Sequence, residues 1–310
     1  MSDKPTVIHN GPIPAVYRAQ LEAHFDLVEL LRGAAVPPEA AGARALIAAG
    51  APVTAALIAA LPQLGAIAAF GVGVDGIDLA TARARNIAVA NAPGATDACV
   101  ADMAMALLLA VTRDLLAGDR FVRAGSWSAG PYPLQHRISG RRMGILGLGR
   151  IGLAIARRAE AFDMPIAYHN RTRRPDLPYA WHPSTRALAE NCDVLVLACL
   201  GGAATAGLVD AAVLEALGPT GVLINIARGS VVDEPALIAA LQSGRIAAAG
   251  LDVFAHEPEV PAALRALPNV LLMPHRAGGT VETAHDCAAS VIANLQAFYR
   301  GEPLLTPISV

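Results

Sequence analysis

The sequence is poor in charged and aromatic residues. Charged residues make up 16% of the 310 residues and aromatic residues 4%, whereas hydrophobic residues make up 54%. The formal net charge is −2, so the chain has no broad electrostatic field with which to attract nucleic acid or an anionic membrane surface. We therefore expect neither as a partner, and any basic binding site must be local.

The four cysteines form no metal-binding or disulfide pattern. They are scattered, without a C-x-x-C spacing or a Cys/His pairing, so the sequence suggests neither a zinc site nor a disulfide framework. We expect no metal ion, and we expect all four to be buried apolar residues. They are Cys99, Cys192, Cys199 and Cys287.

A targeting or membrane-spanning segment is also missing from the pattern. The first residues, MSDKPTVIHNG, have no charged stretch followed by an apolar run, so no signal peptide is predicted and the cytoplasm is the expected location. Residues 45–74 carry no charge and are long enough to cross a bilayer. Because Pro52 and Pro62 interrupt them, a buried strand, helix and strand are predicted there instead.

What the chain does have is an alternation of β-rich and Ala/Leu-rich runs. This pattern is typical of α/β layers built on parallel sheets, and the length suits two domains. The first series breaks at residues 91–98, NAPGATDA, and a second restarts at RRMGILGLGRIG. Between them, the helical stretch before Arg113 is apolar nearly all round, as expected of a helix buried between domains or subunits.

A glycine-spaced turn begins the second series. Gly147, Gly149 and Gly152 form G-x-G-x-x-G between a strand-like run and a helix-like one, and another strand-like run follows. In this context the first glycine permits a tight turn, the second lets the backbone approach a pyrophosphate, and the third allows close packing of the helix. The pattern predicts a dinucleotide site. The alternative is a purely structural turn.

The next predicted strand is followed by basic residues at the place where an acidic residue is usual. An NAD site places an Asp or Glu about 20 residues after the glycines to bind the ribose 2′-hydroxyl, but this chain has Asn170 followed by Arg171, Thr172, Arg173 and Arg174. Asn170 cannot repel a phosphate, and Arg171 with Arg173 or Arg174 can pair with one. We therefore predict NADP(H) rather than NAD(H). A solvated basic loop is the alternative.

Three polar residues each follow an apolar run, where open α/β sheets place ligand-facing groups. They are Arg228, Glu257 and His275. A cation can bind a carboxylate and polarise a carbonyl, an imidazole can exchange a proton near neutral pH, and a carboxylate beside it can orient it and raise its pKa. Together they suit hydride transfer to a 2-oxo acid, although each alone has an ordinary structural explanation.

A second glycine-rich loop, FGVGVDGID at residues 70–78, follows a buried run. Its backbone amides could hold a small anion. A plain strand-to-helix turn is the alternative.

These residues resemble the D-isomer-specific 2-hydroxyacid dehydrogenases over essentially the whole chain. The resemblance rests on GILGLGRIG, INIARGSVVDEPALIAAL, AAAGLDVFAHEP and NVLLMPHRAGGTVET. HNRTRR and GGTVET are most similar to the NADPH-using glyoxylate/hydroxypyruvate reductases. The resemblance implies an α/β fold of two Rossmann-like domains with a cleft between them. These are a flavodoxin-like substrate domain, residues 1–98 plus 285–310, and an NAD(P)-binding Rossmann domain, residues 99–284.

The resemblance also implies roles for the catalytic residues. His275 would protonate the carbonyl oxygen during reduction, Glu257 would keep His275 protonated, and Arg228 would bind the substrate carboxylate and carbonyl. Backbone amides of the glycine-rich loop would contact the same carboxylate, and hydride would pass to C2 to give the D-hydroxy acid. The substrate-binding loop residues implied in this way are Val72, Gly73 and Val74.

On the cofactor side, the resemblance places Arg150 and Ile151 with the glycines at the pyrophosphate, and Asn170, Arg171 and Thr172 at the adenosine phosphate. The residues implied near the nicotinamide are Ile226, Ala227, Arg228, Asp252, Cys199 and Thr96. The family is usually dimeric through a helix that begins here near Val100, and Trp127 resembles a residue that in some reductases reaches the neighbouring active site. A homodimer is therefore expected.

One segment departs from the family pattern, and several alternatives stay open. Where many members have a proline and a threonine-rich loop, this chain has Leu200 and then GGAAT, so the mapping of residues 199–205 is the least secure. The substrate could be a larger 2-oxo acid, such as a phenylpyruvate derivative or 2-ketogluconate. Formate dehydrogenase resembles the chain less well, a short phosphoglycerate dehydrogenase remains possible, and an NAD(P)H-sensing binding module is the alternative outside enzymes.

Overall fold

The computed structural model describes residues 4–31 and 35–308. The chain divides into two compact units. The N-terminal unit comprises Met1–Thr96 and Thr280–Val310, and the central unit comprises Asp97–Gly279. Each has its own parallel sheet and its own apolar core.

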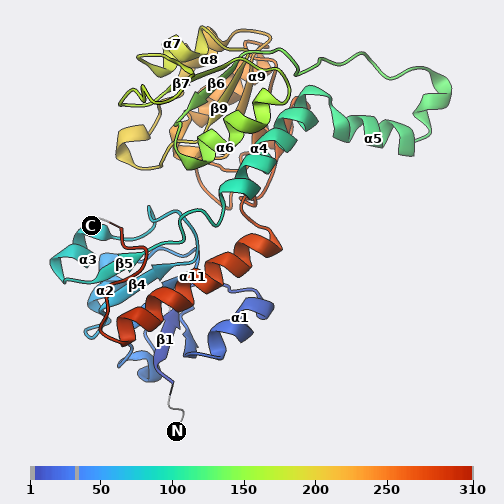
Figure 1. The fold of residues 1–310 in the computed structure, drawn as a ribbon. Coiled ribbons are helices and arrows are strands. Elements are labelled where there is room, and N and C mark those ends of the chain that lie inside the picture. The colour runs from blue at the N-terminus through green and yellow to red at the C-terminus, as the bar shows by residue number, and fades with distance from the viewer. Residues whose placement is uncertain (1–3, 32–34, 309–310) are drawn as a thin grey trace. The chain divides into compact units, whose positions relative to one another are not determined.

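The N-terminal unit is built on a five-stranded parallel sheet (Figure 1). The strand order β2-β1-β3-β4-β5 is that of flavodoxin-like folds. The predicted strand, helix and strand of residues 45–74 are confirmed as β3, α2 and β4. No helix in the described part of the chain is long and apolar enough to cross a membrane. The strands are β1 (Thr6–His9), β2 (Asp26–Glu29), β3 (Ala45–Ala48), β4 (Ala66–Ala69) and β5 (Ala88–Ala90).

Helices from both ends of the sequence cover this sheet. The last helix, α11, packs beside α1 on one face, and Tyr17 and Leu21 share a core there with Val291 and Leu295 (Figure 1). The hydroxyl of Tyr17 also donates to the carbonyl of Val281 at 2.6 Å. The helices are α1 (Ala15–Glu22), α2 (Ala55–Ala59), α3 (Leu79–Ala84) and α11 (Val281–Tyr299), with a short 3-10 turn η1 (Pro38–Ala40).

The central unit is a doubly wound sheet of seven parallel strands in the order β12-β11-β10-β9-β6-β7-β8. Read from its first strand, this is the 3-2-1-4-5-6 order of the dinucleotide-binding fold with one strand added. The predicted α/β fold class is thus confirmed in both units. The strands are β6 (Met143–Leu146), β7 (Ile166–His169), β8 (Ala180–Trp181), β9 (Val194–Leu197), β10 (Val222–Asn225), β11 (Ala248–Leu251) and β12 (Val270–Leu272).

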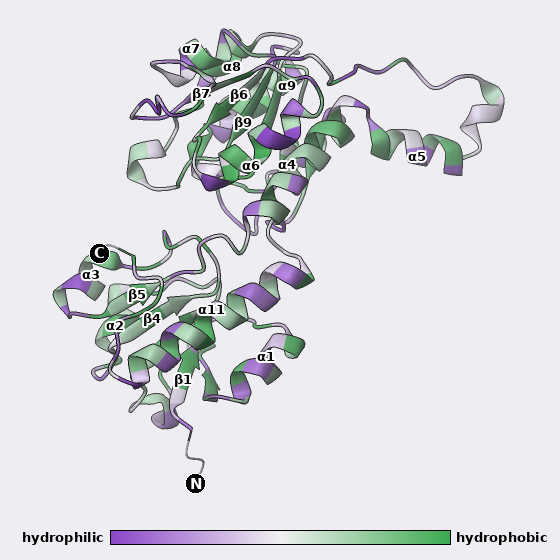
Figure 2. Ribbon diagram, in the orientation of Figure 1, coloured by the Kyte–Doolittle hydropathy of each residue, from purple (hydrophilic) through white to green (hydrophobic). Residues whose placement is uncertain are grey.

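Helices lie on both faces of the seven-stranded sheet, and Figure 2 shows its strands as mostly hydrophobic. One core contains residues of α4 and α6, and the other contains residues of α7, α8 and α9. Two ion pairs join α4 to α6, Asp97–Arg150 at 2.7 Å and Asp102–Arg158 at 2.6 Å. The helices are α4 (Asp97–Thr112), α6 (Arg150–Glu160), α7 (Thr185–Ala189), α8 (Ala211–Leu217), α9 (Glu234–Gln242) and α10 (Ala262–Arg265), with 3-10 turns η3 (Ala203–Thr205) and η4 (Gly229–Val231).

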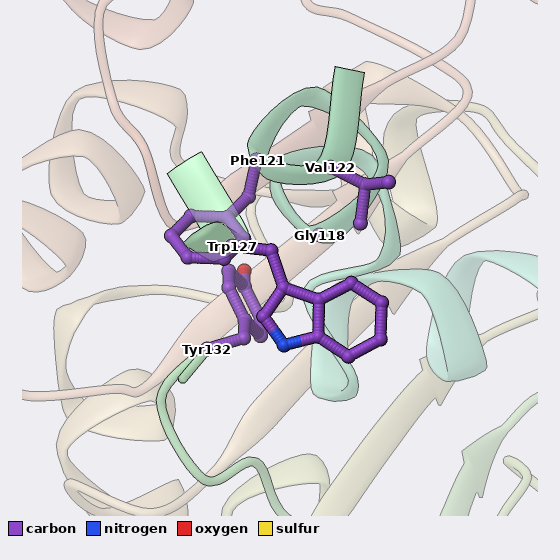
Figure 3. Close-up of a pocket in the computed structure, with 5 residues that line it drawn as sticks. All are labelled: Gly118, Phe121, Val122, Trp127 and Tyr132. Atoms are coloured by element: carbon purple, nitrogen blue, oxygen red, sulfur yellow. The ribbon is translucent and has the colours of Figure 1, made fainter. Parts of the chain in front are cut away.

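The segment after α4 forms an arm, residues 114–134, that extends away from the sheet (Figure 1). It holds α5 (Leu115–Arg123), which has no buried residue, and the 3-10 turn η2 (Ser126–Ala129). The Tyr132 hydroxyl donates to the carboxylate of Asp114 at 2.8 Å, and its ring packs edge-on against Phe121. Figure 3 shows these rings with Trp127 lining a hollow. Its volume is about 350 Å³.

The prediction that all four cysteines are buried is wrong for two of them. Cys192 and Cys287 are buried, but Cys99 and Cys199 are only partly so. Cys99 lies in the first turn of α4, and Cys199 follows β9 at the carboxyl edge of the sheet. Both stand at ends of elements, where the cover over the core is incomplete.

Candidate active site

The turn from β6 to α6 has the geometry of a dinucleotide loop. Gly147 has φ +98°, and a Cβ there would lie 2.5 Å from the backbone of Cys199. A Cβ on Gly152 would lie 2.3 Å from the carbonyl oxygen of Gly147. Gly149 caps α6 without a side-chain hydrogen bond and faces open space. The first N–H groups of α6 therefore lack a capping side chain, which fits a pyrophosphate.

Arg150 and Ile151 follow this turn as the first residues of α6. The Nε atom of Arg150 donates to Asp97 at 2.7 Å, yet the side chain keeps 68% of its surface exposed. Ile151 is partly buried against the core that α4 and α6 share. The guanidinium thus stands beside the turn, held on one side by α4.

Asn170 braces the glycine turn from the end of β7. Its Oδ1 atom accepts the backbone N–H of Leu148 at 2.7 Å. Its own carbonyl accepts the indole N–H of Trp181 at 3.2 Å. The residue predicted to meet the adenosine phosphate therefore also fixes the loop between Gly147 and Gly149, a role that the sequence did not indicate.

The basic stretch after Asn170 separates into two kinds of arginine. Arg171 and Arg173 are exposed and have no hydrogen-bond or ion-pair partner among the described residues, and Thr172 between them is exposed as well. Arg174 instead pairs with Asp176 at 2.7 Å, and its backbone bonds the hydroxyl of Tyr168. Arg171 and Arg173 are thus the arginines whose guanidinium groups are available to an external anion.

Arg228 stands on a turn that Asn225 shapes. The buried side chain of Asn225, at the end of β10, accepts the N–H of Ala227 at 3.0 Å and donates to the carbonyl of Arg228 at 3.0 Å. Ile226 and Ala227 are buried between them. The Nη1 atom of Arg228 donates to the carbonyl of Ala227 at 2.7 Å, and the side chain is only partly buried.

Glu257 and His275, which follow β11 and β12, form a hydrogen-bonded pair. The Oε2 atom of Glu257 lies 2.7 Å from Nδ1 of His275. The other carboxylate oxygen, Oε1, accepts the N–H of Phe254 at 3.0 Å. The side chains keep 33% and 48% of their surface exposed, so a ligand can reach both.

The pair shifts the pKa of each partner in opposite directions. The hydrogen bond to Glu257 raises the pKa of His275 and outweighs burial, which acts to lower it. Burial acts to raise the pKa of Glu257, but the hydrogen bonds from His275 and from Phe254 bring that pKa below its usual value. His275 is therefore held towards its protonated form, which a general acid requires.

Asp252 holds the backbone that carries His275. Its buried carboxylate accepts the N–H of Arg276 at 2.7 Å and that of Ala277 at 2.8 Å, and its carbonyl accepts the N–H of His275 at 2.8 Å. Burial raises the pKa of Asp252, although the two N–H groups oppose this. Both carboxylate oxygens are thus engaged by the loop that follows β12.

The loop at residues 199–205, where the sequence departs from the family pattern, lies between the glycine turn and Arg228. The backbone of Cys199 approaches Gly147, and a Cβ on Gly201 would come within 2.6 Å of Cγ of Arg228. The Thr205 hydroxyl donates to the carbonyl of Leu200 at 2.7 Å and closes the loop. Leu200 itself is 83% exposed.

The remaining predicted site residues belong to the N-terminal unit. Val72, Gly73 and Val74 follow β4 in a loop without regular structure, and the carbonyl of Val72 accepts a hydrogen bond from Asn91 at 2.8 Å. Thr96 is the last residue of that unit before the chain enters α4.

Comparisons with known proteins identify the family of this chain. A family model described as "D-isomer specific 2-hydroxyacid dehydrogenase, NAD binding domain" matches residues 105–277. The chain belongs to the D-isomer-specific 2-hydroxyacid dehydrogenases. The predicted family is thus confirmed, and this dehydrogenase has an NAD-binding domain in its central unit.

Relatives of this dehydrogenase are named for different substrates. It is 48% identical to hydroxyphenylpyruvate reductase of Plectranthus scutellarioides over 254 residues, 82% of this chain and 81% of that one. It is 44% identical to 2-ketogluconate reductase of Gluconobacter oxydans over 313 residues, 99% of this chain and 100% of that one.

A solved structure is also similar over the whole chain. It is the NADPH-dependent glyoxylate/hydroxypyruvate reductase of Sinorhizobium meliloti in complex with NADP and malonate. The TM-score is 0.94 at 43% identity, covering 99% of this chain and 97% of that one.

Proposed function

We propose that this dehydrogenase reduces a small 2-oxo acid, glyoxylate or hydroxypyruvate, to the D-2-hydroxy acid with NADPH. The observation that supports this most is the 2.7 Å contact between Glu257 and His275. Because Nδ1 of His275 is engaged by Glu257, Nε2 is the atom that gives its proton to the carbonyl oxygen. Glu257 keeps the imidazole protonated and oriented for that step.

Arg228 binds the substrate in this proposal. Its guanidinium holds the carboxylate and polarises the neighbouring carbonyl, a charge-assisted contact suited to that planar group. Val72, Gly73 and Val74 are the substrate-binding residues proposed in the N-terminal unit, which serves as the substrate domain. NADPH, when bound, supplies the hydride that reaches C2.

NADP(H) is the proposed cofactor, in preference to NAD(H). The support is that Arg171 and Arg173 are exposed and have no partner within residues 4–31 and 35–308. They lie beside Asn170, at the strand end where an NAD site has an acid. A 2′-phosphate would give these guanidinium groups a partner. The residues that would hold the cofactor are Gly147, Gly149, Arg150, Ile151, Gly152, Asn170, Arg171, Thr172, Cys199, Ile226, Ala227, Asp252 and Thr96.

A larger substrate is the second candidate. The similarity to hydroxyphenylpyruvate reductase and to 2-ketogluconate reductase favours a 2-oxo acid with a long side chain. Both candidates use the same chemistry at Arg228, Glu257 and His275 and differ only in what the side-chain pocket accepts.

Steady-state rates test the proposed substrate and cofactor. We would measure the consumption of NADPH and of NADH with glyoxylate, hydroxypyruvate, hydroxyphenylpyruvate and 2-ketogluconate. The highest kcat/KM is expected with NADPH and one of the first two acids. A higher kcat/KM with a larger acid would select the second candidate, and cofactor binding without turnover of any acid would select a binding module.

A homodimer is proposed as the assembly, formed through α4 and the arm. Among the described residues, five of the ten exposed large apolar side chains lie within the arm, which leaves an apolar surface without cover. They are Leu115, Leu116, Val122, Trp127 and Leu134. Light scattering of the purified protein should give the mass of two chains, and Leu116→Glu should shift it towards one chain.

A further inference from the structure

Glu234 is a buried carboxylate outside the proposed catalytic set. It is the first residue of α9 and only 8% exposed. Its Oε2 atom accepts the backbone N–H of Ala255 at 3.2 Å. A buried carboxylate is costly unless it is hydrogen-bonded, and the N-terminus of a helix offsets part of that cost. The hydrogen bond with Ala255 therefore helps to stabilise this carboxylate in its buried position.

The backbone that Glu234 contacts leads directly to Glu257. Ala255 lies two residues before Glu257, and the N–H of the preceding residue, Phe254, donates to Oε1 of Glu257 at 3.0 Å. This segment also packs against the turn that follows Arg228. A Cβ on Gly229 would lie 1.9 Å from the carbonyl carbon of Phe254. Two contacts thus fix Phe254 and Ala255, one from Glu234 and one from Gly229.

We propose that Glu234 is a positioning residue, which fixes the Phe254–Ala255 backbone so that Glu257 presents Oε2 to His275. The inference rests on the proposed function, because it assigns Glu234 an effect on the general acid. The hydrogen bond of the Glu234 side chain goes to Ala255, and not to the glycine turn after β6 or to Arg228.

The partial exposure of the catalytic pair makes such a support necessary. Glu257 and His275 keep 33% and 48% of their side-chain surface exposed, so close packing alone does not hold them. The orientation of Glu257 depends on the N–H of Phe254, and the place of that N–H depends on Gly229 and Glu234. A shift of about 1 Å in a reacting group can lower a rate by about 10²-fold.

The pH dependence of reduction reports on this arrangement. The charged groups that act on His275 are Glu257, Arg228 and Asp252. Glu234 is not among them, so its removal reaches His275 through the orientation of Glu257. Reduction needs protonated His275 and is lost as the pH rises through the pKa of that residue. A weaker contact with Glu257 moves this alkaline loss to lower pH.

The chain offers a matched control on the same helix. Asp233 caps α9 by accepting the N–H of Ala236 at 3.0 Å. Asp233→Ala removes a helix cap, which costs about 0.5–2 kcal/mol of stability, and leaves the contact with Ala255 in place. Glu234→Gln keeps an oxygen acceptor at the contact, whereas Glu234→Ala and the more space-filling Glu234→Met remove it.

The experiment is the pH profile of kcat for 2-oxo acid reduction by these variants and by Glu257→Gln, with the melting temperature of each. In Glu234→Ala, or in Glu234→Met if the alanine variant does not fold, the alkaline loss of kcat should begin at a lower pH than in the wild type. The maximal kcat should be up to about 10²-fold lower. The KM for NADPH should stay unchanged, and Glu234→Gln should resemble the wild type. Asp233→Ala should lower the melting temperature without moving the profile.

Two outcomes overturn the assignment. One is a wild-type pH profile in the variants that lack the acceptor. The other is an equal shift in Asp233→Ala, which would reduce the role of Glu234 to general stability. If Glu257→Gln also fails to move the profile, the proposed role of the Glu257–His275 pair is wrong. If Glu257→Gln moves the profile and Glu234→Ala does not, only the role of Glu234 is wrong.

Discussion

His275 and Asp252 are joined by a backbone hydrogen bond of 2.8 Å at a point where His275 adopts φ +52°. A residue other than glycine rarely adopts this left-handed conformation, and it persists when the surroundings enforce it. Here Asp252 does so by binding the N–H groups of Arg276 and Ala277 as well. The imidazole is thereby directed from a rigid turn towards Glu257, whose Oε2 atom lies 2.7 Å from Nδ1.

Replacing Glu257 with Gln should move the pH dependence of reduction. The carboxylate raises the pKa of His275, and activity is lost as the pH rises through that pKa. Without the negative charge the pKa of His275 falls, so the alkaline loss of kcat should begin at lower pH. The measurement is kcat against pH with saturating NADPH. An unchanged alkaline limb would show that Glu257 does not set the protonation of His275.

Replacing Arg171 with Ala should weaken the binding of NADPH and leave the binding of NADH nearly unchanged. A hydrogen bond to a charged group contributes about 1.5–3 kcal/mol, equal to an increase of about 10- to 150-fold in the Kd for NADPH. Fluorescence titration with each cofactor measures this. Arg174→Ala is the matched control, because the guanidinium of Arg174 already pairs with Asp176. Equal losses for the two cofactors would point to a structural role of Arg171.

Replacing Asn170 with Asp should shift the preference towards NADH while the glycine turn keeps its shape. Aspartate can still accept the N–H of Leu148, which Oδ1 of Asn170 now holds at 2.7 Å, and its charge repels a 2′-phosphate but can bind a ribose hydroxyl. Asn170→Ala removes the brace and should weaken the binding of both cofactors. If the aspartate variant also lost both cofactors equally, the brace would not explain the role of Asn170.

Replacing Gly201 with Ala should impair substrate binding. The new methyl group would come within 2.6 Å of Cγ of Arg228 and displace that side chain. Loss of a charged hydrogen bond predicts a KM for the 2-oxo acid raised about tenfold or more, with the Kd for NADPH unchanged. Ala204→Ser, on the exposed part of the same loop, is the control. A wild-type KM in Gly201→Ala would mean that Arg228 adapts without cost.

The sequence predicted the fold class because its signals are local. Periodic apolar runs and glycine spacing determine strands, helices and the turn at Gly147, and polar residues after strands indicate the ligand edge of a parallel sheet. Arg228, Glu257 and His275 were proposed as site residues in this way. The structure then supplied the strand orders, which the sequence did not predict. It also brought Glu257 and His275 within 2.7 Å of each other, a distance that no spacing in the sequence measures.

The supporting contacts could not be predicted, since each joins residues that are distant in the chain or depends on atomic detail. The brace from Asn170 to Leu148 spans 22 positions, and the contact from Glu234 to Ala255 spans 21. The two partly exposed cysteines were mispredicted from the average burial of that residue type, which ignores where an element ends. The pairing of Arg174 with Asp176, two residues away, could have been predicted from the sequence. This ion pair distinguishes Arg174 from Arg171.

The most direct test of the account is the single-turnover rate of hydride transfer in His275→Asn with NADPH already bound. General acid catalysis contributes about 10²–10⁴-fold, so the rate of NADPH oxidation by glyoxylate or hydroxypyruvate should fall by that factor while the Kd for NADPH stays at the wild-type value. A rate near that of the wild type would contradict the assignment of His275 as the proton donor.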